Sequence, residues 1–236
     1  MQAWVEDLLA IAHEGGPADQ VFARVESAVQ RLGFEHCAYG LRDVLSNAGS
    51  QVVMLNNYPT NWRVRYASMG YLEQDPTVAL GRRSTVPLIW SDEMFASARH
   101  LWEDARAFGL RHGWAQSSLD APDIGGMLTV ARATEAISEC ELRTNGARLQ
   151  LLACVAHQAL SRALRWQICA SLDSLVPRER EVLRWTAEGK SSQEAAALMS
   201  ISRATIEYHV RNAMRKLGAP NKTAAAVRAT MLGLLG

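Results

Sequence analysis

Lysine is missing from most of the chain. The first 170 residues contain none, and the three lysines of the protein are Lys190, Lys216 and Lys222. This absence excludes from the front part any chemistry that needs a lysine amine, and arginine supplies all of its basic side chains. Long apolar runs are missing too, so no segment of the sequence is predicted to span a bilayer.

Cysteine pairs and targeting signals are also lacking. Cys37, Cys140, Cys154 and Cys169 are scattered and form no CxxC pair. We expect reduced, mostly buried thiols in a cytoplasmic protein. The N-terminus carries Glu6 and Asp7 early and has no basic segment, so it is not predicted to be a signal peptide.

Catalytic and metal-binding signatures are absent. The sequence has no GxSxG or HExxH motif, and none of its six histidines has a partner at metal-ligand spacing. These absences argue against a hydrolase, and we expect no metal and no cofactor.

The charge is divided unevenly along the chain. Residues 1–170 hold 15 arginines and 18 acidic residues, a net charge of −3, whereas residues 171–236 hold 10 basic and 6 acidic residues, a net charge of +4; the sum is +1. With 236 residues, of which 48% are hydrophobic, the chain is long enough for two domains. The basic tail suggests nucleic acid as a partner.

The front part alternates helical and extended patterns. Helical periodicity covers 3–31, with a break at Gly15–Pro17, and returns over 92–108 and 139–167, while a short helix is expected within 57–76. Strand patterns cover 34–41, 51–55, 114–119 and 127–131. We therefore predict an α+β fold, an α/β/α sandwich with an antiparallel sheet, followed by a linker at 168–176.

Helix start and stop signals in the tail predict four helices. Pro177 suits a first helical turn and Gly189 a helix end, and Ser191 with Glu194 forms a capping box for a second helix. Ser202 caps a third helix after a tight turn, which is typical of a helix-turn-helix. A fourth helix with many small residues is expected to reach Leu235, packing in the domain core or across a dimer.

The third helix of the tail has two different faces. Its apolar residues recur at helical spacing and form one continuous stripe along the helix. They are Ile206, Val210, Ala213, Met214 and Leu217. The opposite face presents Glu207, Tyr208, Arg211, Asn212 and Arg215, which can read base edges and contact phosphates in a DNA major groove. A solvated amphipathic helix would show the same pattern.

The tail resembles the LuxR-type helix-turn-helix. The residues that carry the resemblance are Arg178, Glu179, Leu183, Trp185, Gly189, Lys190, Glu194, Ser202, Thr205, His209, Asn212, Lys216 and Leu217. Two positions depart from the family pattern. Val176 stands where the family has a threonine that caps the first helix, which costs about 1 kcal/mol unless Ser174 or another group substitutes, and Ala195 stands where isoleucine is common.

The front part resembles the autoinducer-binding domain of the quorum-sensing branch of that family. The matching residues are Tyr58, Trp62, Tyr66, Asp75, Pro76, Trp90 and Gly113. The wider pattern is most similar to receptors for longer-chain N-acyl homoserine lactones. Ala38, Ser117, Asp120 and Asp123 depart from it, so the resemblance supports the head-group contacts better than the length or 3-position substitution of the acyl tail.

The resemblance implies a role for each pocket residue. The Trp62 indole N–H would donate to the lactone ring carbonyl, Asp75 would accept from the amide N–H, and Tyr58, with Thr129 nearby, would donate to the amide carbonyl. Trp90 would pack on the lactone ring and Tyr66 on the chain. The expected tail contacts are Met54, Val78, Leu110 and Met127.

The resemblance also implies roles on DNA. Glu207 and Arg211 are candidates for base-edge contacts. The candidates for phosphate contacts are Lys190, Thr205, Tyr208 and Arg215, whereas His209 is expected to form a hydrogen bond within the domain.

These expectations combine into one predicted function, a ligand-responsive transcription regulator without enzymatic activity. Residues 1–167 would bind an N-acyl homoserine lactone and dimerise through a long helix at 142–164, and residues 177–236 would bind an inverted repeat in double-stranded DNA as a homodimer. The same architecture could sense a different small molecule. A two-component response regulator is disfavoured because its receiver domain needs a lysine, which the front part lacks.

Overall fold

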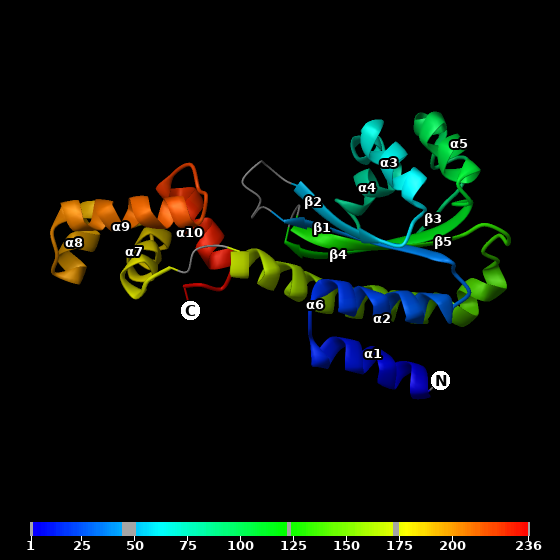
Figure 1. Ribbon diagram of the computed structural model, residues 1–236, viewed down its shortest axis with the longest axis horizontal. Helices are drawn as coiled ribbons and strands as arrows, with labels where there is room; N and C mark the ends of the chain where they lie inside the picture. Colours follow the sequence, from blue (N-terminus) through cyan, green and yellow to red (C-terminus); the bar gives the residue numbers. More distant parts are fainter. Residues whose placement is uncertain (1, 44–50, 122–123, 172–174, 236) are drawn as a thin grey trace. The chain divides into compact units, whose positions relative to one another are not determined.

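The structure is a computed structural model in which residues 2–43, 51–121, 124–171 and 175–235 are described (Figure 1). Contacts between Cα atoms divide the chain into two compact units. The first comprises residues 1–43 and 52–164, and the second contains residues 165–236. Within the described residues, no helix is long and apolar enough to cross a membrane.

The first unit is built on a five-stranded sheet in the order β2-β1-β5-β4-β3. Its strands are β1 His36–Asp43, β2 Gln51–Asn56, β3 Leu88–Ile89, β4 His112–Ala121 and β5 Ile124–Arg132. The pairs β1/β5, β4/β5 and β3/β4 are antiparallel, which confirms the predicted α+β class. Four strands were expected with slightly different ends, and β3 was not expected as a strand because two residues show no alternation.

Three helices lie on one side of the sheet: α1 Gln2–Glu14, α2 Ala18–Gln30 and α6 Glu139–Ser171 (Figure 1). The largest core cluster joins them to the sheet through side chains such as Val25, Tyr39, Val130 and Leu152. Pro17 stands at the N-cap of α2, so the chain turns where the glycine–proline break predicted it. The helix α6 continues to Ser171, past the predicted helix end and into the segment expected as linker.

The other face carries short helices and turns (Figure 1). They are α3 Thr60–Ser68, the 3-10 turn η1 Tyr71–Glu73, α4 Pro76–Gly81, the 3-10 turn η2 Ala96–Ala98 and α5 Arg99–Ala107. An aromatic cluster that includes Trp62, Tyr71, Phe95 and Trp102 packs among them. The sequence predicted α3 and α5, the latter as part of a longer helix over 92–108, but not α4. This arrangement completes the predicted α/β/α sandwich.

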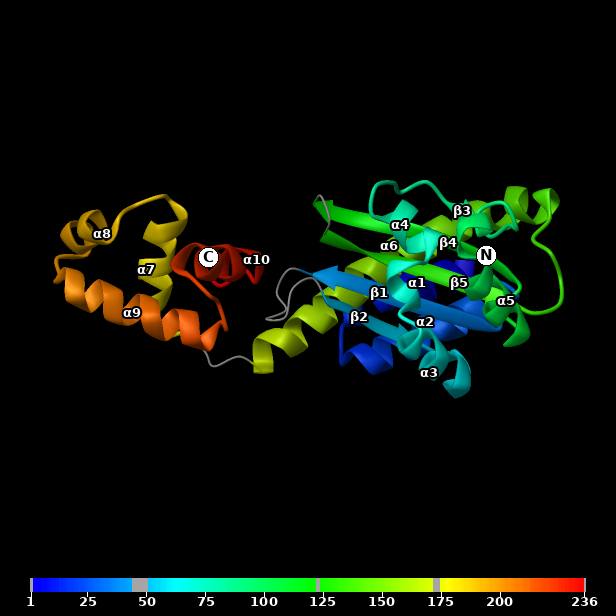
Figure 2. The same cartoon turned by 90° about the horizontal axis from the view of Figure 1, so that it is seen from above.

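The second unit contains the helices α7 Pro177–Ala187, α8 Ser192–Met199, α9 Arg203–Lys216 and α10 Lys222–Met231. Figure 2 shows α8 at one end of α9 and α10 at the other. Ser200, with φ of 53°, makes the tight turn between α8 and α9. The four predicted helices are confirmed, but the last ends at Met231 rather than Leu235. Its small residues Ala225 and Ala229 are buried in the core of this unit, as expected.

The ends of these helices show how the tail compensates for its missing cap. Val176 occupies the N-cap of α7, and its backbone N–H donates to Glu179 Oε2 at 2.9 Å. The same oxygen accepts from Lys216 Nζ of α9 at 2.9 Å. Glu179 therefore stabilises the first turn of α7 and ties it to α9. Ser191 and Glu194 form the predicted capping box, and Ser202 Oγ accepts from the Thr205 N–H.

The cysteines only partly match the expectation of buried thiols. Cys37 is buried, and burial, followed by the charge of Glu26, raises the pKa of its thiol to about 12. Cys140 and Cys154 are exposed, so the prediction is wrong for these two. Both lie on α6, on turns whose buried positions are filled by other residues such as Leu149 and Leu152.

Candidate functional site

A cavity of about 440 Å³ lies in the first unit, on the sheet face that carries α3 and α4. Strand side chains point to alternate faces, and the residues of β1, β2 and β4 that line the cavity are spaced two apart. Paired positions form three rows across the sheet. In order along the strands, the rows are Ala38 with Thr129, then Gly40 with Met127 and Ser117, then Arg42 with Gly125 and Leu119.

The cavity brings together every residue that the sequence predicted for ligand binding. Its walls include the six predicted head-group and ring contacts, Tyr58, Trp62, Tyr66, Asp75, Trp90 and Thr129. They also include the four predicted tail contacts, Met54, Val78, Leu110 and Met127. These residues come from β2, α3, α4, β5 and the connections around Tyr58, Trp90 and Leu110, so their convergence on one cavity depends on the folding of the whole unit.

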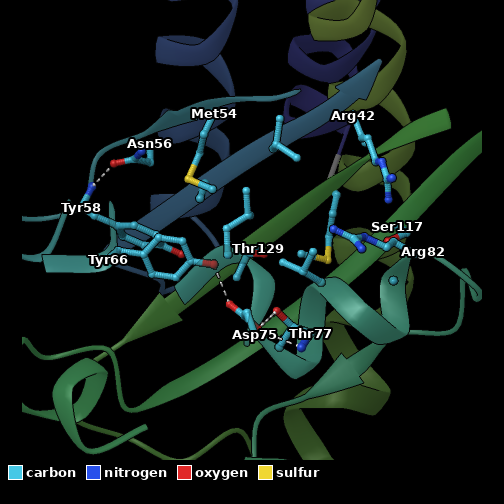
Figure 3. A pocket seen from close by; sticks show the side chains of 18 of the residues that line it. Arg42, Met54, Asn56, Tyr58, Tyr66, Asp75, Thr77, Arg82, Ser117 and Thr129 are labelled. Carbon is cyan, nitrogen blue, oxygen red and sulfur yellow. Dashed lines mark hydrogen bonds between the residues drawn. The ribbon is translucent and has the colours of Figure 1, made fainter. Parts of the chain in front are cut away.

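Asp75 is held in place by its neighbours (Figure 3). It is the N-cap of α4, where Oδ1 accepts from the Thr77 N–H at 2.8 Å and from the Thr77 hydroxyl at 2.6 Å. Oδ2 accepts from the Tyr66 hydroxyl at 3.0 Å. Burial raises the pKa of the carboxyl above its ordinary value, against the opposing effect of these hydrogen bonds.

Three donors around Asp75 make no hydrogen bond with another described residue: the Tyr58 hydroxyl, the Trp62 indole N–H and the Thr129 hydroxyl. The Trp62 ring is fixed by stacking on Tyr71, at a centroid distance of 6.1 Å, and by an edge contact with Tyr66 at 5.6 Å. Burial raises the pKa of Tyr58, so its hydroxyl stays protonated and able to donate. The site therefore offers one carboxyl acceptor and several fixed donors.

Trp90 packs flat against the backbone of Gly113. The backbone N–H of Trp90 donates to the Gly113 carbonyl at 2.9 Å. A Cβ atom at Gly113 would lie only 2.2 to 2.6 Å from atoms of the Trp90 ring, so only glycine leaves room for it. The buried Trp90 Nε1 has no hydrogen-bond partner among the described residues. Gly113, one of the residues that carry the family resemblance, thus sets the position of the Trp90 ring.

Several cavity residues were not predicted as ligand contacts. They are mainly polar or small: Arg42, Asn56, Thr77, Gly81, Arg82 and Ser117. Arg42 could have been found, because it follows Ala38 and Gly40 at strand spacing. Arg82 could not, because α4 itself was not expected. Ser117 was noted only as a departure from the family pattern, and it is buried against Gly81.

The second unit presents α9 as predicted. Ile206, Val210 and Ala213 are buried, whereas Tyr208 and Arg211 are exposed on the other face. Lys190 and Arg215 are also exposed, and Thr205 is half-buried at the start of the helix. This arrangement leaves the predicted contact face open to a ligand as large as DNA.

Two residues of this face behave differently from the expectation. Glu207 Oε1 accepts from Arg203 Nε one turn earlier at 2.7 Å, so one candidate for base contact is engaged by a neighbour. Nδ1 of His209 is buried and has no hydrogen-bond partner among the described residues. The expected hydrogen bond within the domain is therefore not made by that atom.

A cavity lined by fixed donors and an acceptor, in one chain with a helix-turn-helix, defines the class of ligand-responsive DNA-binding regulators. Two family models match the chain: the autoinducer binding domain over residues 18–160, and the bacterial regulatory proteins of the luxR family over residues 173–229. The chain belongs to the LuxR family of bacterial regulatory proteins, in its autoinducer-binding, quorum-sensing branch, and it is not an enzyme.

Individual relatives match over nearly the full length. The transcriptional activator protein AnoR of Acinetobacter nosocomialis is 40% identical over 238 residues, which cover 100% of both chains. The crystal structure of SdiA from Escherichia coli aligns with a TM-score of 0.80 at 32% identity, over 100% of this chain and 98% of that one. SdiA in complex with octanoyl-rac-glycerol aligns with a TM-score of 0.79 at 33% identity, over 99% and 96%.

Proposed function

We propose that the first unit binds an N-acyl homoserine lactone and that the protein then binds an inverted repeat in DNA as a homodimer. The observation that carries the proposal is the grouping of Asp75 with the unpaired donors of Tyr58, Trp62 and Thr129 on one cavity. An acyl homoserine lactone has one amide N–H and two carbonyls, which is the complement of this set.

Each contact follows from donor and acceptor chemistry. Asp75 accepts a hydrogen bond from the ligand amide N–H through Oδ2, the oxygen that also accepts from the Tyr66 hydroxyl. The Trp62 indole donates to the ring carbonyl, and the Tyr58 hydroxyl donates to the amide carbonyl, with Thr129 as a second donor. The Trp90 ring covers the lactone, and Tyr66 covers the start of the chain. The rest of the cavity, lined by residues such as Met54 and Met127, holds the acyl tail.

The ligand would act through stability and assembly. A ligand that fills the cavity of the folded unit stabilises it by mass action. We assign dimerisation to α6, one face of which is buried in its own unit while the opposite face exposes Leu151. Two copies would place two α9 helices in successive major grooves of an inverted repeat. The domain limits 1–167, 168–176 and 177–236 and a cytoplasmic location are parts of this proposal.

On DNA, Arg211 would read a base edge, and Glu207 would do so once released from Arg203. The residues proposed for phosphate contacts are Lys190, Thr205, Tyr208 and Arg215. These residues lie on α9 or just before α8, and Lys190, Tyr208, Arg211 and Arg215 are exposed there. The division between base and phosphate contacts follows from side-chain chemistry, because arginine and glutamate can pair with base edges.

A panel of N-acyl homoserine lactones tests the proposal. The full-length protein is titrated with each lactone while its thermal unfolding and its binding to a palindromic DNA are measured. The proposal expects stabilisation by at least one lactone and tighter DNA binding in its presence. Recovery of no lactone from protein expressed with candidate signals, together with no stabilisation by any lactone, would refute it.

A second candidate ligand is a monoacylglycerol. It is supported by the complex of the relative SdiA with octanoyl-rac-glycerol. A glycerol ester has hydroxyl donors and an ester carbonyl, which could meet Asp75 and the donors of Tyr58 and Trp62. Including monoacylglycerols of matched chain length in the same panel separates the two ligand classes.

A further inference from the structure

The cavity changes character along its length. The first row of strand residues, Ala38 and Thr129, lies beside the proposed head-group contacts, and Arg42 lies on the same strand four residues further on. Because a strand rises about 3.4 Å per residue, Arg42 lies roughly 14 Å along β1 from Ala38. Figure 3 shows Arg42, Arg82 and Ser117 together on one side of the pocket and Tyr58 and Tyr66 on the other, with Asp75 below and between them.

The segment between these two polar ends is apolar. Met54, Val78 and Met127 line it from β2, α4 and β5. An alkyl tail that started at Asp75 would pass over these side chains and then meet the basic end of the cavity. The order of the lining is therefore polar, apolar and polar, which differs from the lining that a purely hydrocarbon tail requires.

Arg82 has buried hydrogen-bonding capacity that no protein group uses. Its Nε is buried and has no hydrogen-bond partner among the described residues. Its Nη2 lies 3.8 Å from Glu73 Oε2, whose side chain is 76% exposed. A solvated partner at that distance neutralises the guanidinium only weakly, and leaving a buried donor unpaired is unfavourable.

Ser117 lies directly against the turn that carries Arg82. A Cβ atom built on Gly81, the residue before Arg82, would lie 2.4 Å from Ser117 Oγ. Ser117 itself is only 5% exposed. The close contact brings a hydroxyl from β4 next to the end of α4, so the two groups face the same part of the cavity.

We propose that Arg82 and Ser117, with Arg42 beside them, form a second polar subsite that binds an oxygen acceptor carried near the distal end of the ligand's acyl chain. The inference rests on the proposed function, because it takes the acyl ligand and the position of its head group from there. A guanidinium only donates hydrogen bonds, so the complementary group is a hydroxyl, carbonyl or carboxylate oxygen. A carboxylate binds most tightly because its charge opposes that of Arg82.

Matched ligand pairs test the subsite. Each pair consists of an N-acyl homoserine lactone with an alkyl end and the lactone of the same chain length with a terminal hydroxyl or carboxylate. Dissociation constants are measured with the full-length protein by titration calorimetry, over a series of chain lengths. At the length that reaches the subsite, we expect the oxygenated member to bind roughly tenfold more tightly or better.

Three variants test which residues cause the preference for an oxygenated chain end. Arg82→Met keeps the aliphatic stem and removes the guanidinium, so it should reduce the preference to near unity and leave the affinity for the alkyl-ended lactone equal or higher. Ser117→Ala should lower the preference with little change in packing. Arg83→Met is the matched control, because Arg83 is exposed and does not line the cavity, and it should keep the preference of the wild type.

The outcomes separate the two proposals. Tight binding of alkyl-ended lactones with no preference for an oxygenated end at any length overturns the subsite but leaves the proposed function standing. A preference that survives both Arg82→Met and Ser117→Ala also overturns it. If no lactone of either kind binds, the proposed function fails and the subsite fails with it.

Discussion

The Tyr66 hydroxyl donates a hydrogen bond to Asp75 Oδ2 at 3.0 Å, while the other carboxylate oxygen is used to cap α4. One oxygen of Asp75 therefore serves the fold, and the other faces the cavity with a single protein donor. This division lets a carboxylate stay buried without a basic partner and still accept a hydrogen bond from a ligand. It also makes Asp75 the residue at which the two roles can be separated.

Asp75→Asn should weaken ligand binding while keeping the cap. An asparagine oxygen can still accept from the Thr77 N–H, but its NH₂ group would then face the Tyr66 hydroxyl and the ligand amide. We expect affinity for the lactone to fall by about 2 kcal/mol, roughly thirtyfold. Asp75→Ala should lose the same affinity and also about 1 kcal/mol of stability through the lost cap. Calorimetric titration and urea unfolding of both variants check this, and equal stability of the two would contradict the assignment.

Ligand binding should depend on pH through the same group. Burial raises the pKa of Asp75 in the free protein, and an amide N–H donated by the ligand favours the ionised form and so lowers that pKa in the complex. Affinity is then greatest above the pKa of the free protein and falls as pH drops through it towards the pKa of the complex. Thermal stabilisation by ligand, measured against pH, should show this fall in the wild type and not in Asp75→Asn. An identical profile in both proteins would exclude Asp75 as its source.

Gly113→Ala should damage the pocket although Gly113 itself does not line the cavity. The added Cβ would lie 2.2 to 2.6 Å from the Trp90 ring, and the hydrogen bond between the two backbones prevents their separation. We expect a loss of about 1 to 3 kcal/mol in stability and a marked loss of ligand affinity, as the ring is displaced. Gly146→Ala on α6 is the control, because a Cβ there meets nothing within 4 Å. Ligand affinity unchanged in Gly113→Ala would show that the position of Trp90 does not matter.

Lys216→Met should destabilise the second unit. Glu179 is only 3% exposed, and removing the ammonium group 2.9 Å away leaves its carboxylate buried without that partner. Breaking a buried pair in this way costs about 3 to 5 kcal/mol. Chemical unfolding of the full chain, followed by the circular dichroism of its helices, measures the loss. A change below about 1 kcal/mol would mean that Glu179 serves mainly as the cap of α7.

Arg211→Ala should weaken specific DNA binding and leave ligand uptake intact. A bidentate contact between arginine and guanine contributes about 1 to 3 kcal/mol of discrimination. Fluorescence anisotropy with a palindromic DNA and a scrambled DNA measures this difference. Arg178→Ala is the control, since Arg178 is an exposed arginine on α7 rather than on α9. Parallel loss of DNA binding and ligand binding in Arg211→Ala would indicate misfolding instead.

The sequence predicted the pocket best where spacing along one element determines which side chains meet. Trp62 and Tyr66, four residues apart, share a face of α3, and their rings are in contact. Alternation along β5 likewise places Thr129 and Met127 on the same face. The helix-turn-helix could be predicted equally well, because the N-caps Ser191 and Ser202 are signals in the local sequence.

The sequence predicted least where the outcome depends on packing between distant segments. The two-residue strand β3 and the short helix α4 have no periodicity of their own, so Arg82 could not be placed. The pairing of β1 with β5, which puts Arg42 opposite Gly125, is set by tertiary contacts. The role of Glu179 as a substitute cap was also hidden, because only the fold brings Lys216 to it.

The most direct test of the central claim is one measurement: the thermal unfolding of the wild type and of Asp75→Asn with and without N-acyl homoserine lactones of increasing chain length. Binding at Asp75 predicts that at least one lactone raises the unfolding temperature of the wild type and that the rise is largely lost in Asp75→Asn. Equal stabilisation of both proteins, or of neither by any lactone, would contradict it.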